Sequence, residues 1–328
     1  MIIVRPADVP PNETTATGAV LTASNVPETD AGEAEWVSGP SYDVGDIVSV
    51  LGDTQRRYES LIDYNQGNDP VDDDGTNWLD LGATNRWRMF DGGTGTLTRQ
   101  AESIEVTIKP SNLVNAIAFF NVSASQIRVT ATPQNSSEVG YDQTYDLIIG
   151  LEESNWWSYF FGSINSQIDP TRDLVLLNLP QYINPTITVT ISRGDIYTTD
   201  PDAQPSIGQL VVGRQQNFGA TLYGSSVGIK DYSRKESDVF GNFQVVERRF
   251  SKTAEFDVIL STQNVAGLQR ALAERRATPT VYIGSEKACL DCADQIHEET
   301  LIYGYYRDFN VVLSNRNTSS LSIEIEGL

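Results

Sequence analysis

The chain has little cysteine, histidine or positive charge. Its 328 residues include two Cys, one His, 23 Lys and Arg, and 44 Asp and Glu, which give a net charge of −21. A single histidine excludes an H-E-x-x-H zinc protease site and allows a Ser-His-Asp triad only through His297. Since Lys and Arg supply most of the affinity for phosphate groups, we expect no nucleic-acid partner.

Long apolar runs and catalytic motifs are also missing. The apolar stretch 116–120 is far shorter than the roughly 20 residues of a membrane-spanning helix, so we expect no membrane insertion. "MIIV" is too short for a signal-peptide core, which predicts assembly in a cytosol. No G-x-S-x-G, P-loop or G-x-G-x-x-G motif occurs, and we expect neither an enzyme nor a cofactor. Paired carboxylates of a glycosidase have no fixed spacing and stay an open alternative.

The acidic run "DPVDDDG" does not fit an EF-hand. With Gly75 as the sixth loop position, Pro70 and Leu81 would occupy the first and twelfth, and neither supplies the required ligand. Asp72, Asp73 and Asp74 remain a weak calcium candidate.

The two cysteines form the sequence "CLDC", with the histidine five residues beyond. We expect a polar loop with two thiols and no bound metal. Zinc would need a fourth ligand from Asp291, Asp294 or Glu298, and a redox pair would need a helix start after a strand. The candidate metal ligands are Cys289, Cys292 and His297.

Strand-like alternation dominates the middle of the chain. Apolar residues alternate with polar ones at 104–108, 127–129 and 187–191, which places one face of each strand in a core. Several short strands without a helix predict a β-sandwich. A cluster of Trp156, Trp157, Tyr159, Phe160 and Phe161 fits a sandwich core or domain contact better than a ligand platform.

The last third changes to an α+β pattern. Residues 264–276 predict an amphipathic helix, capped by Thr262 or Asn264, and strands are expected on both sides of it. The fold class expected is mainly β and multidomain: a three-stranded module, a β-sandwich, and a C-terminal β-barrel with one helix. The boundaries expected are 1–35 for an extended arm or disordered segment, 36–92, 93–199, a linker at 200–207, and 208–328.

The small module resembles a known family. Trp36, Tyr42 followed by "VGDIVSV", Gly52, Tyr58, Pro70 and Trp78 are similar in order and spacing to the chitin-binding domains attached to bacterial chitinases. From the residues alone, Trp36, Tyr42, Tyr58 and Trp78 form the core of a sheet too small for an aliphatic interior. The resemblance implies sugar contacts at Tyr64 and Trp78. However, Ile62 and Asp63 stand where the relatives expose tryptophans, so we favour a structural use.

Three further segments resemble virion proteins of tailed bacteriophages. They are "WLDLGATNRWRMFDG", "FGATLYGSSVGIKDYSRKESDVFGN" and "YGYYRDFNVVLSNRNTSSLSIEIEGL". The resemblance implies a structural protein of the tail tip or baseplate, such as a distal tail protein, located in the virion. Its partners would be other tail proteins and copies of itself in a ring. The alternative is an adhesin that binds a glycan of the host surface.

A basic segment offers a candidate assembly surface. Residues 1–100 carry six Arg and no Lys against 17 acidic residues, a net charge of −11. Such a surface would attract a positive one on a neighbouring subunit. A solvated mixed-charge loop is the alternative, because Asp231, Glu236, Asp238 and Glu247 are interspersed. The basic candidates are Lys230, Arg234, Lys235, Arg248, Arg249 and Lys252.

Overall fold

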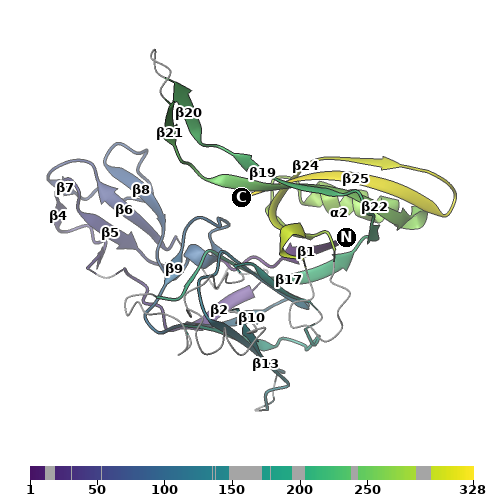
Figure 1. The fold of residues 1–328 in the computed structure, drawn as a ribbon. Coiled ribbons are helices and arrows are strands. Elements are labelled where there is room, and N and C mark those ends of the chain that lie inside the picture. Colours follow the sequence, from purple (N-terminus) through teal and green to yellow (C-terminus); the bar gives the residue numbers. More distant parts are fainter. Residues whose placement is uncertain are drawn as a thin grey trace, which may run out of the picture. The chain divides into compact units, whose positions relative to one another are not determined.

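The structure is a computed structural model, and it is mainly β with one α-helix in the part described (Figure 1). Two compact units make up the chain. The terminal unit contains Met1–Pro6 and Gly213–Leu328, and the middle unit contains Ala7–Val212. The residues described are 1–11, 19–30, 32–52, 54–134, 136, 138–147, 172–177, 179–193, 204–237, 243–285 and 297–328.

The middle unit contains a β-sandwich. One layer is an antiparallel sheet of five strands in the order β13-β12-β15-β10-β2. The facing layer includes β11, β14 and the start of β17. The bounds of these strands are β2 Ala19–Ser24, β10 Ser103–Pro110, β11 Ala116–Phe120, β12 Gln126–Thr132, β13 Tyr141–Asp146, β14 Leu174–Leu177, β15 Thr186–Ser192 and β17 Gln209–Asn217.

Alternating side chains build the sandwich core, as the sequence predicts. In β10, every second residue is buried, so Ile104, Val106 and Ile108 face inward. They pack in one cluster with apolar residues of the other layer, including Phe119 and Leu176. The strands of that layer are apolar at nearly every position, because both of their faces are covered. The predicted aromatic cluster at 156–161 lies outside the described residues.

The small module is a sheet in the order β3-β5-β6-β8, flanked by the two-stranded pair β4-β7. Three antiparallel strands, β5, β6 and β8, form the predicted three-stranded unit, and β3 adds a parallel edge. The bounds are β3 Ala34–Glu35, β4 Ser41–Tyr42, β5 Ile47–Val50, β6 Arg56–Ser60, β7 Asn65–Gln66 and β8 Trp78–Ala83.

A short connection leads from the module into the sandwich. The 3-10 helix η2 (Arg88–Phe90) carries Met89, which is fully buried in the sandwich core. Next, β9 (Thr98–Arg99) pairs with β16 (Ser206–Ile207). The last two residues of the predicted linker 200–207 therefore form the strand β16. Residues 200–203 are not among the residues described.

The terminal unit is built on a curled antiparallel sheet. Its strands follow the order β17-β1-β23-β24-β25-β22, and β18 and β19 both pair with β22. The strands β20 and β21 form a narrow ribbon beyond β19 and β22 (Figure 1). The bounds are β1 Ile2–Pro6, β18 Ala220–Thr221, β19 Ser226–Asp231, β20 Arg234–Ser237, β21 Phe243–Val246, β22 Phe250–Ser261, β23 Thr280–Ile283, β24 Leu301–Val312 and β25 Thr318–Gly327.

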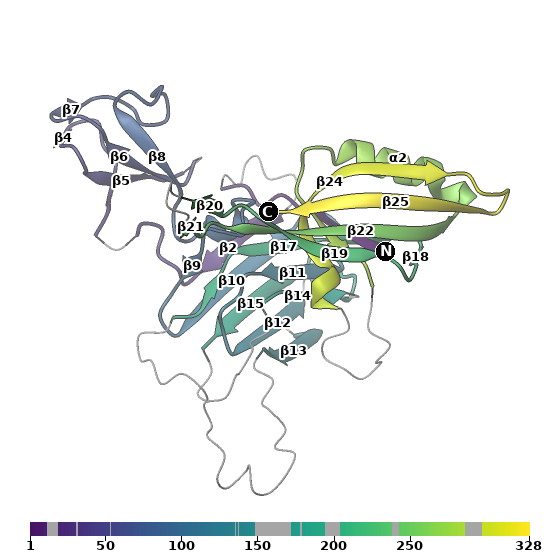
Figure 2. The same cartoon turned by 45° about the horizontal axis from the view of Figure 1, so that its top comes forward.

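The helix α2 (Val265–Glu274) covers one face of β22, β24 and β25 (Figure 2). Leu268 and Leu272 are fully buried against the sheet, and Val265 packs beside them. The predicted capping is wrong, because Asn264 makes no side-chain cap bond and Thr262 instead bonds to Asn315. A 3-10 turn, η3 (Thr262–Asn264), precedes the helix, and another, η4 (Glu298–Thr300), precedes β24.

The expected N-terminal arm is wrong for two segments of residues 1–35. The strand β1 lies between β17 and β23, and it pairs with both. The strand β2 pairs with β10 and ends the sandwich sheet. The physical reason is that "MIIV" is apolar throughout and fills a central strand position, where both backbone edges are hydrogen-bonded.

Within the described ranges, none of the helices has the length and the apolar character that a bilayer crossing requires.

Candidate functional site

The core of the small module rests on two aromatic residues. Tyr58 is 7% exposed and Trp78 is 2% exposed, and both pack on Val48. Trp36 and Tyr42 are half-buried beside them. The Trp78 indole donates a hydrogen bond to the Asn68 carbonyl over 3.1 Å and meets the Tyr42 ring edge-on at 5.4 Å. Trp78 is therefore enclosed and is unavailable to stack on a sugar.

The acidic run before Trp78 organises a turn. The Asp73 carboxylate accepts hydrogen bonds from the backbone N–H groups of Gly75, Asn77 and Trp78. Desolvation acts to raise the pKa of Asp73, but these bonds and the one from the Asn77 side chain outweigh it and lower that pKa. The run thus holds the start of β8, where Trp78 enters the core.

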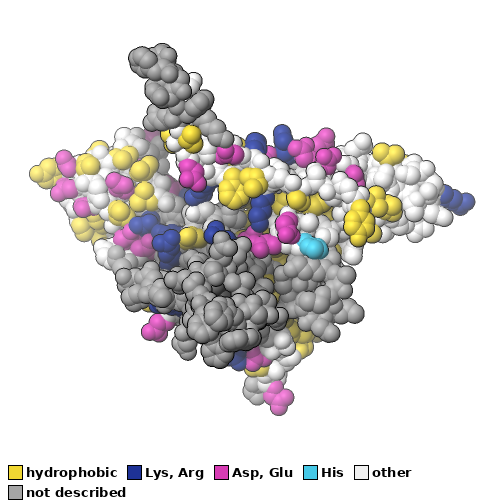
Figure 3. Space-filling model, viewed as in Figure 1, with side chains coloured by type: hydrophobic (Ala, Val, Ile, Leu, Met, Phe, Trp, Pro, Cys, Tyr) yellow, Lys and Arg dark blue, Asp and Glu magenta, His cyan; other side chains and the backbone are white. Residues whose placement is uncertain are grey.

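Tyr64 is an exposed aromatic residue of the module. It is 83% exposed and has a φ of +56°, a left-handed conformation that bulky residues rarely adopt. Two aspartates hold this conformation by crossed hydrogen bonds: Asp43 accepts from the Tyr64 N–H, and Asp63 accepts from the Val44 N–H. Leu61 and Ile62, nearby in sequence, and Val44, which bonds to Asp63, are also exposed. Hydrophobic side chains show on the module surface (Figure 3).

Ion pairs tie the module to the segment that enters it. The Arg57 guanidinium bonds the Glu33 carboxylate through two nitrogens, and it lies 3.3 Å from Asp30. Arg88, beyond β8, pairs with Asp30 at 2.8 Å. Partial burial acts to raise the pKa of Glu33, but the hydrogen bond and charge of Arg57 lower it below the ordinary value of 4.5. We call Asp30, Glu33, Arg57 and Arg88 the ionic staple.

The predicted basic surface is largely paired within the chain. Lys230 contacts Glu326 at 2.7 Å, and Arg234 forms an ion pair with Glu236. Arg249 and Lys252 also have interaction partners, whereas the Arg248 side chain is exposed. The side chain of Lys235 lies outside the description. The structure brings these residues onto β19–β22 and its ribbon, as a mixed-charge surface rather than a positive one.

The same strands expose an apolar face that sequence analysis missed. Val227 pairs with Ala254 and Ile229 with Lys252, so Val227 and Ile229 share the face on which Ala254 is buried. Val227, Ile229 and Phe250 are 50%, 68% and 57% exposed, although they continue the face that α2 covers farther along β22. We call these three residues the bare face. The alternation of Val227 and Ile229 in "SVGI" could have predicted an apolar face on this strand.

β19 also has an open edge. In the described part of the chain it pairs with β22 on one side and with no strand on the other. An unpaired strand edge presents backbone donors and acceptors in the spacing of a sheet. The edge is suited to pairing with another strand, and the bare face beside it is suited to an apolar contact.

The candidate metal ligands are not brought together by any described contact. Cys289 and Cys292 lie outside the described residues. His297 lies 3.9 Å from Glu299, in an exposed position. Among the residues described, no group of three or more His, Cys, Asp and Glu is arranged to hold a metal ion.

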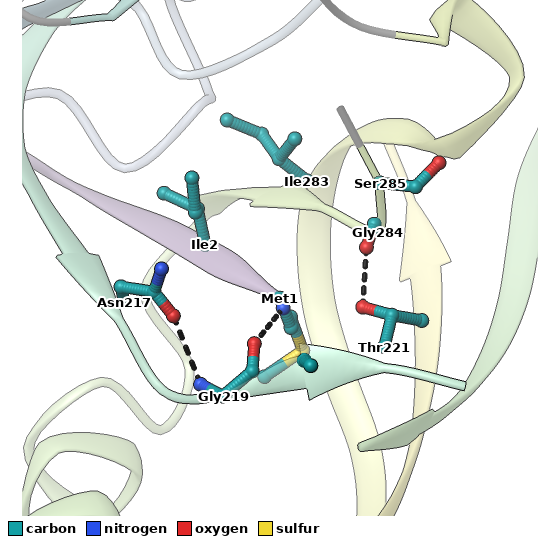
Figure 4. Close-up of a pocket in the computed structure, with 9 residues that line it drawn as sticks. Met1, Ile2, Asn217, Gly219, Thr221, Ile283, Gly284 and Ser285 are labelled. Carbon is teal, nitrogen blue, oxygen red and sulfur yellow. Dashed lines mark hydrogen bonds between the residues drawn. The ribbon is translucent and has the colours of Figure 1, made fainter. Parts of the chain in front are cut away.

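A pocket of about 260 Å³ lies in the terminal unit (Figure 4). Its polar groups bond to one another: Thr221 donates to the Gly284 carbonyl, and the Gly219 N–H donates to Asn217. Gly219 has a φ of +140°, and a Cβ there would lie 2.1 Å from the Ile259 carbonyl oxygen. The lining carries no Asp, Glu, His or Cys among the residues described, so we assign it no chemistry.

Comparison with protein-family models gives no match, and comparison with curated proteins gives none either.

Proposed function

We propose that this chain is a structural protein of the tail tip or baseplate of a tailed bacteriophage, and that it assembles with copies of itself into a ring. The bare face and open edge of β19 carry the proposal. An exposed apolar strand edge is an aggregation hazard for a monomer, and natural proteins cover such edges or use them for pairing. A strand from a neighbouring subunit would satisfy the edge, and apolar side chains of that subunit packed on the sheet would bury Val227, Ile229 and Phe250.

The proposal also agrees with the resemblance of three segments to phage virion proteins. One of these segments contains β18, β19 and β20, and another contains most of β24 and all of β25. Of these strands, β18, β19 and β25 pair with β22 in the terminal unit. A ring requires heterologous contacts, in which one surface of a subunit meets a different surface of the next.

The test is native mass spectrometry of the full chain and of Ile229→Lys. We expect the native chain to form one closed oligomer, and Ile229→Lys to be monomeric, because a lysine on the bare face would lose its hydration in the contact. Leu313→Lys is the matched control, since Leu313 is 66% exposed, close to the 68% of Ile229, but lies outside the bare face. A monomeric native chain, or equal effects of both variants, would contradict the proposed contact.

The second candidate function is a carbohydrate-binding adhesin, and Tyr64 favours it. A strained, exposed aromatic held by two carboxylates is a pre-formed platform for an apolar sugar face. On a glycan array, this function predicts binding that Tyr64→Ala abolishes and that Tyr223→Ala, at another exposed tyrosine, leaves intact. No binding by the native chain would remove this alternative.

A further inference from the structure

Arg275 carries a buried charge that the described part of the chain leaves incompletely paired. It follows α2, is only 6% exposed, and donates one hydrogen bond from Nη2 to the Gln216 side chain over 2.6 Å. Its other terminal nitrogen, Nη1, is enclosed and has no acceptor. The negative end of the helix dipole offsets part of this charge, but an enclosed guanidinium nitrogen ordinarily has an acceptor of its own.

Two more arginines lie on strands β1 and β17 of the sheet. Arg5 on β1 and Arg214 on β17 are direct cross-strand partners, and both are exposed. Like charges placed opposite each other destabilise a sheet. In the described residues, neither forms an ion pair. Gly213 allows the close approach of these strands, because a Cβ there would lie 2.1 Å from the Arg5 carbonyl oxygen.

The three arginines share one side of the sheet. Gln216, which holds Arg275, pairs with Ile3, and Ile3 is two residues from Arg5. Burial and the nearby charge of Arg5 lower the pKa of Arg275. Tyr282 pairs with Ile3 from β23, and its side chain is fully buried. Burial raises the pKa of Tyr282 to about 12, so the hydroxyl remains a neutral donor.

We propose that Arg5, Arg214 and Arg275 form a binding site for carboxylates of an acidic polypeptide segment from a partner protein. The carboxylates bind the guanidinium groups of Arg5 and Arg214 at the surface, and the charge of Arg275 beneath them adds attraction that solvent screens little. A nucleic acid is disfavoured because most of its affinity comes from many phosphate contacts, and this site offers three arginines. This site is separate from the bare face and does not depend on the proposed function.

The binding test uses a fluorescent hexaglutamate peptide and the full chain at low ionic strength, followed by anisotropy. We expect hexaglutamate to bind and hexaglutamine not to bind. Arg5→Gln/Arg214→Gln should weaken binding by about tenfold or more, since each charge-assisted hydrogen bond contributes more than a neutral one. The matched control is Arg270→Gln/Arg316→Gln, which removes the same charge from exposed positions. Absence of binding, or equal weakening by both double variants, would overturn the proposal.

Two further measurements test the ligand class and the role of Arg275. They use inorganic phosphate as a competitor and the variant Arg275→Met. If phosphate competes as well as the peptide at equal charge concentration, the site is one for small anions and the polypeptide ligand is refuted. Arg275→Met should weaken peptide binding without lowering the melting temperature, because it removes an incompletely paired buried charge. A lower melting temperature with unchanged peptide affinity would show instead that Arg275 is only structural.

Discussion

At the scale of single residues, the aromatic side chains of the small module divide into interior and surface positions. Trp78 has a hydrogen-bonded indole and a ring contact on the inside, whereas Tyr64 projects from a strained turn. The aromatic residues of the module therefore serve two purposes. Only the buried ones, such as Trp78, stabilise the fold. This division changes the expectation for Trp78, which was a candidate for sugar contact.

Replacing Trp78 by Ala should unfold the small module. The loss of a buried tryptophan costs about 3–5 kcal/mol, and this core has few other residues to compensate. Hydrogen exchange of the full chain would measure it, as lost protection of the amides in β5, β6 and β8. Leu79→Ala, at a neighbouring position that is 47% exposed, is the control and should retain protection. Protection that survives in Trp78→Ala would refute the core assignment.

The ionic staple makes the module sensitive to acid. The folded-state pKa of Glu33 lies below its ordinary value of 4.5, so the stability from this carboxylate is present above that value and is lost as the pH falls through the folded pKa. Glu33 faces Arg57, Asp30, Arg88 and Ser49. Thermal melts below about pH 4.5 should therefore show falling stability.

The variant Glu33→Gln isolates this contribution. It should be less stable than the native chain at neutral pH, and the difference should shrink on acidification, because the native Glu33 then also loses its charge. Glu35→Gln, at an exposed position on β3, serves as the control. A stability difference that stays constant from neutral to acid pH would contradict the role of the Glu33 charge.

At the scale of elements, the strands with strict alternation could be predicted from sequence. β10, β12 and β15 each have one buried face, so the period of two was visible in "SIEVTIKP" and "TITVTIS". β1 could not be recognised in the same way, because its apolar run is short and its partners on β17 and β23 lie more than 200 residues away. Local patterns do not contain such pairings.

β1 supplies a test of the terminal unit. Ile3 is fully buried in the core shared with α2, so Ile3→Ala should destabilise this unit by about 2–5 kcal/mol. Denaturant unfolding followed by hydrogen exchange of β22 and β25 would measure the change. Ile183→Ala makes the same chemical change at a position that is 80% exposed and should shift stability by less than about 0.5 kcal/mol. Equal, small effects would mean that residues 1–6 are the loose arm first expected.

The candidate surfaces were less predictable than the strands. The sequence showed the basic residues of 230–252, but it did not show that Lys230 meets Glu326, 96 residues away. The arginine site was missed because Arg5, Arg214 and Arg275 come from three distant segments. By contrast, the family resemblance already implied a sugar contact at Tyr64, and the side chain is exposed.

At the scale of the whole molecule, the chain combines two compact units with several surfaces that the described contacts leave uncovered. The bare face and the open edge of β19 suit a copy of the chain. The arginine site suits an acidic partner, and Tyr64 offers a small aromatic platform. A protein with separate surfaces for several neighbours is suited to assembly, and this supports the proposed place in a phage tail.

The most direct test is whether the chain is part of the phage particle. Particles purified from a culture that produces the chain would be analysed by quantitative mass spectrometry and by electron microscopy with an antibody against the chain. Our account predicts a fixed number of copies per particle and labelling confined to a ring at the tail tip. A chain that is absent from purified particles and monomeric in solution would contradict the account.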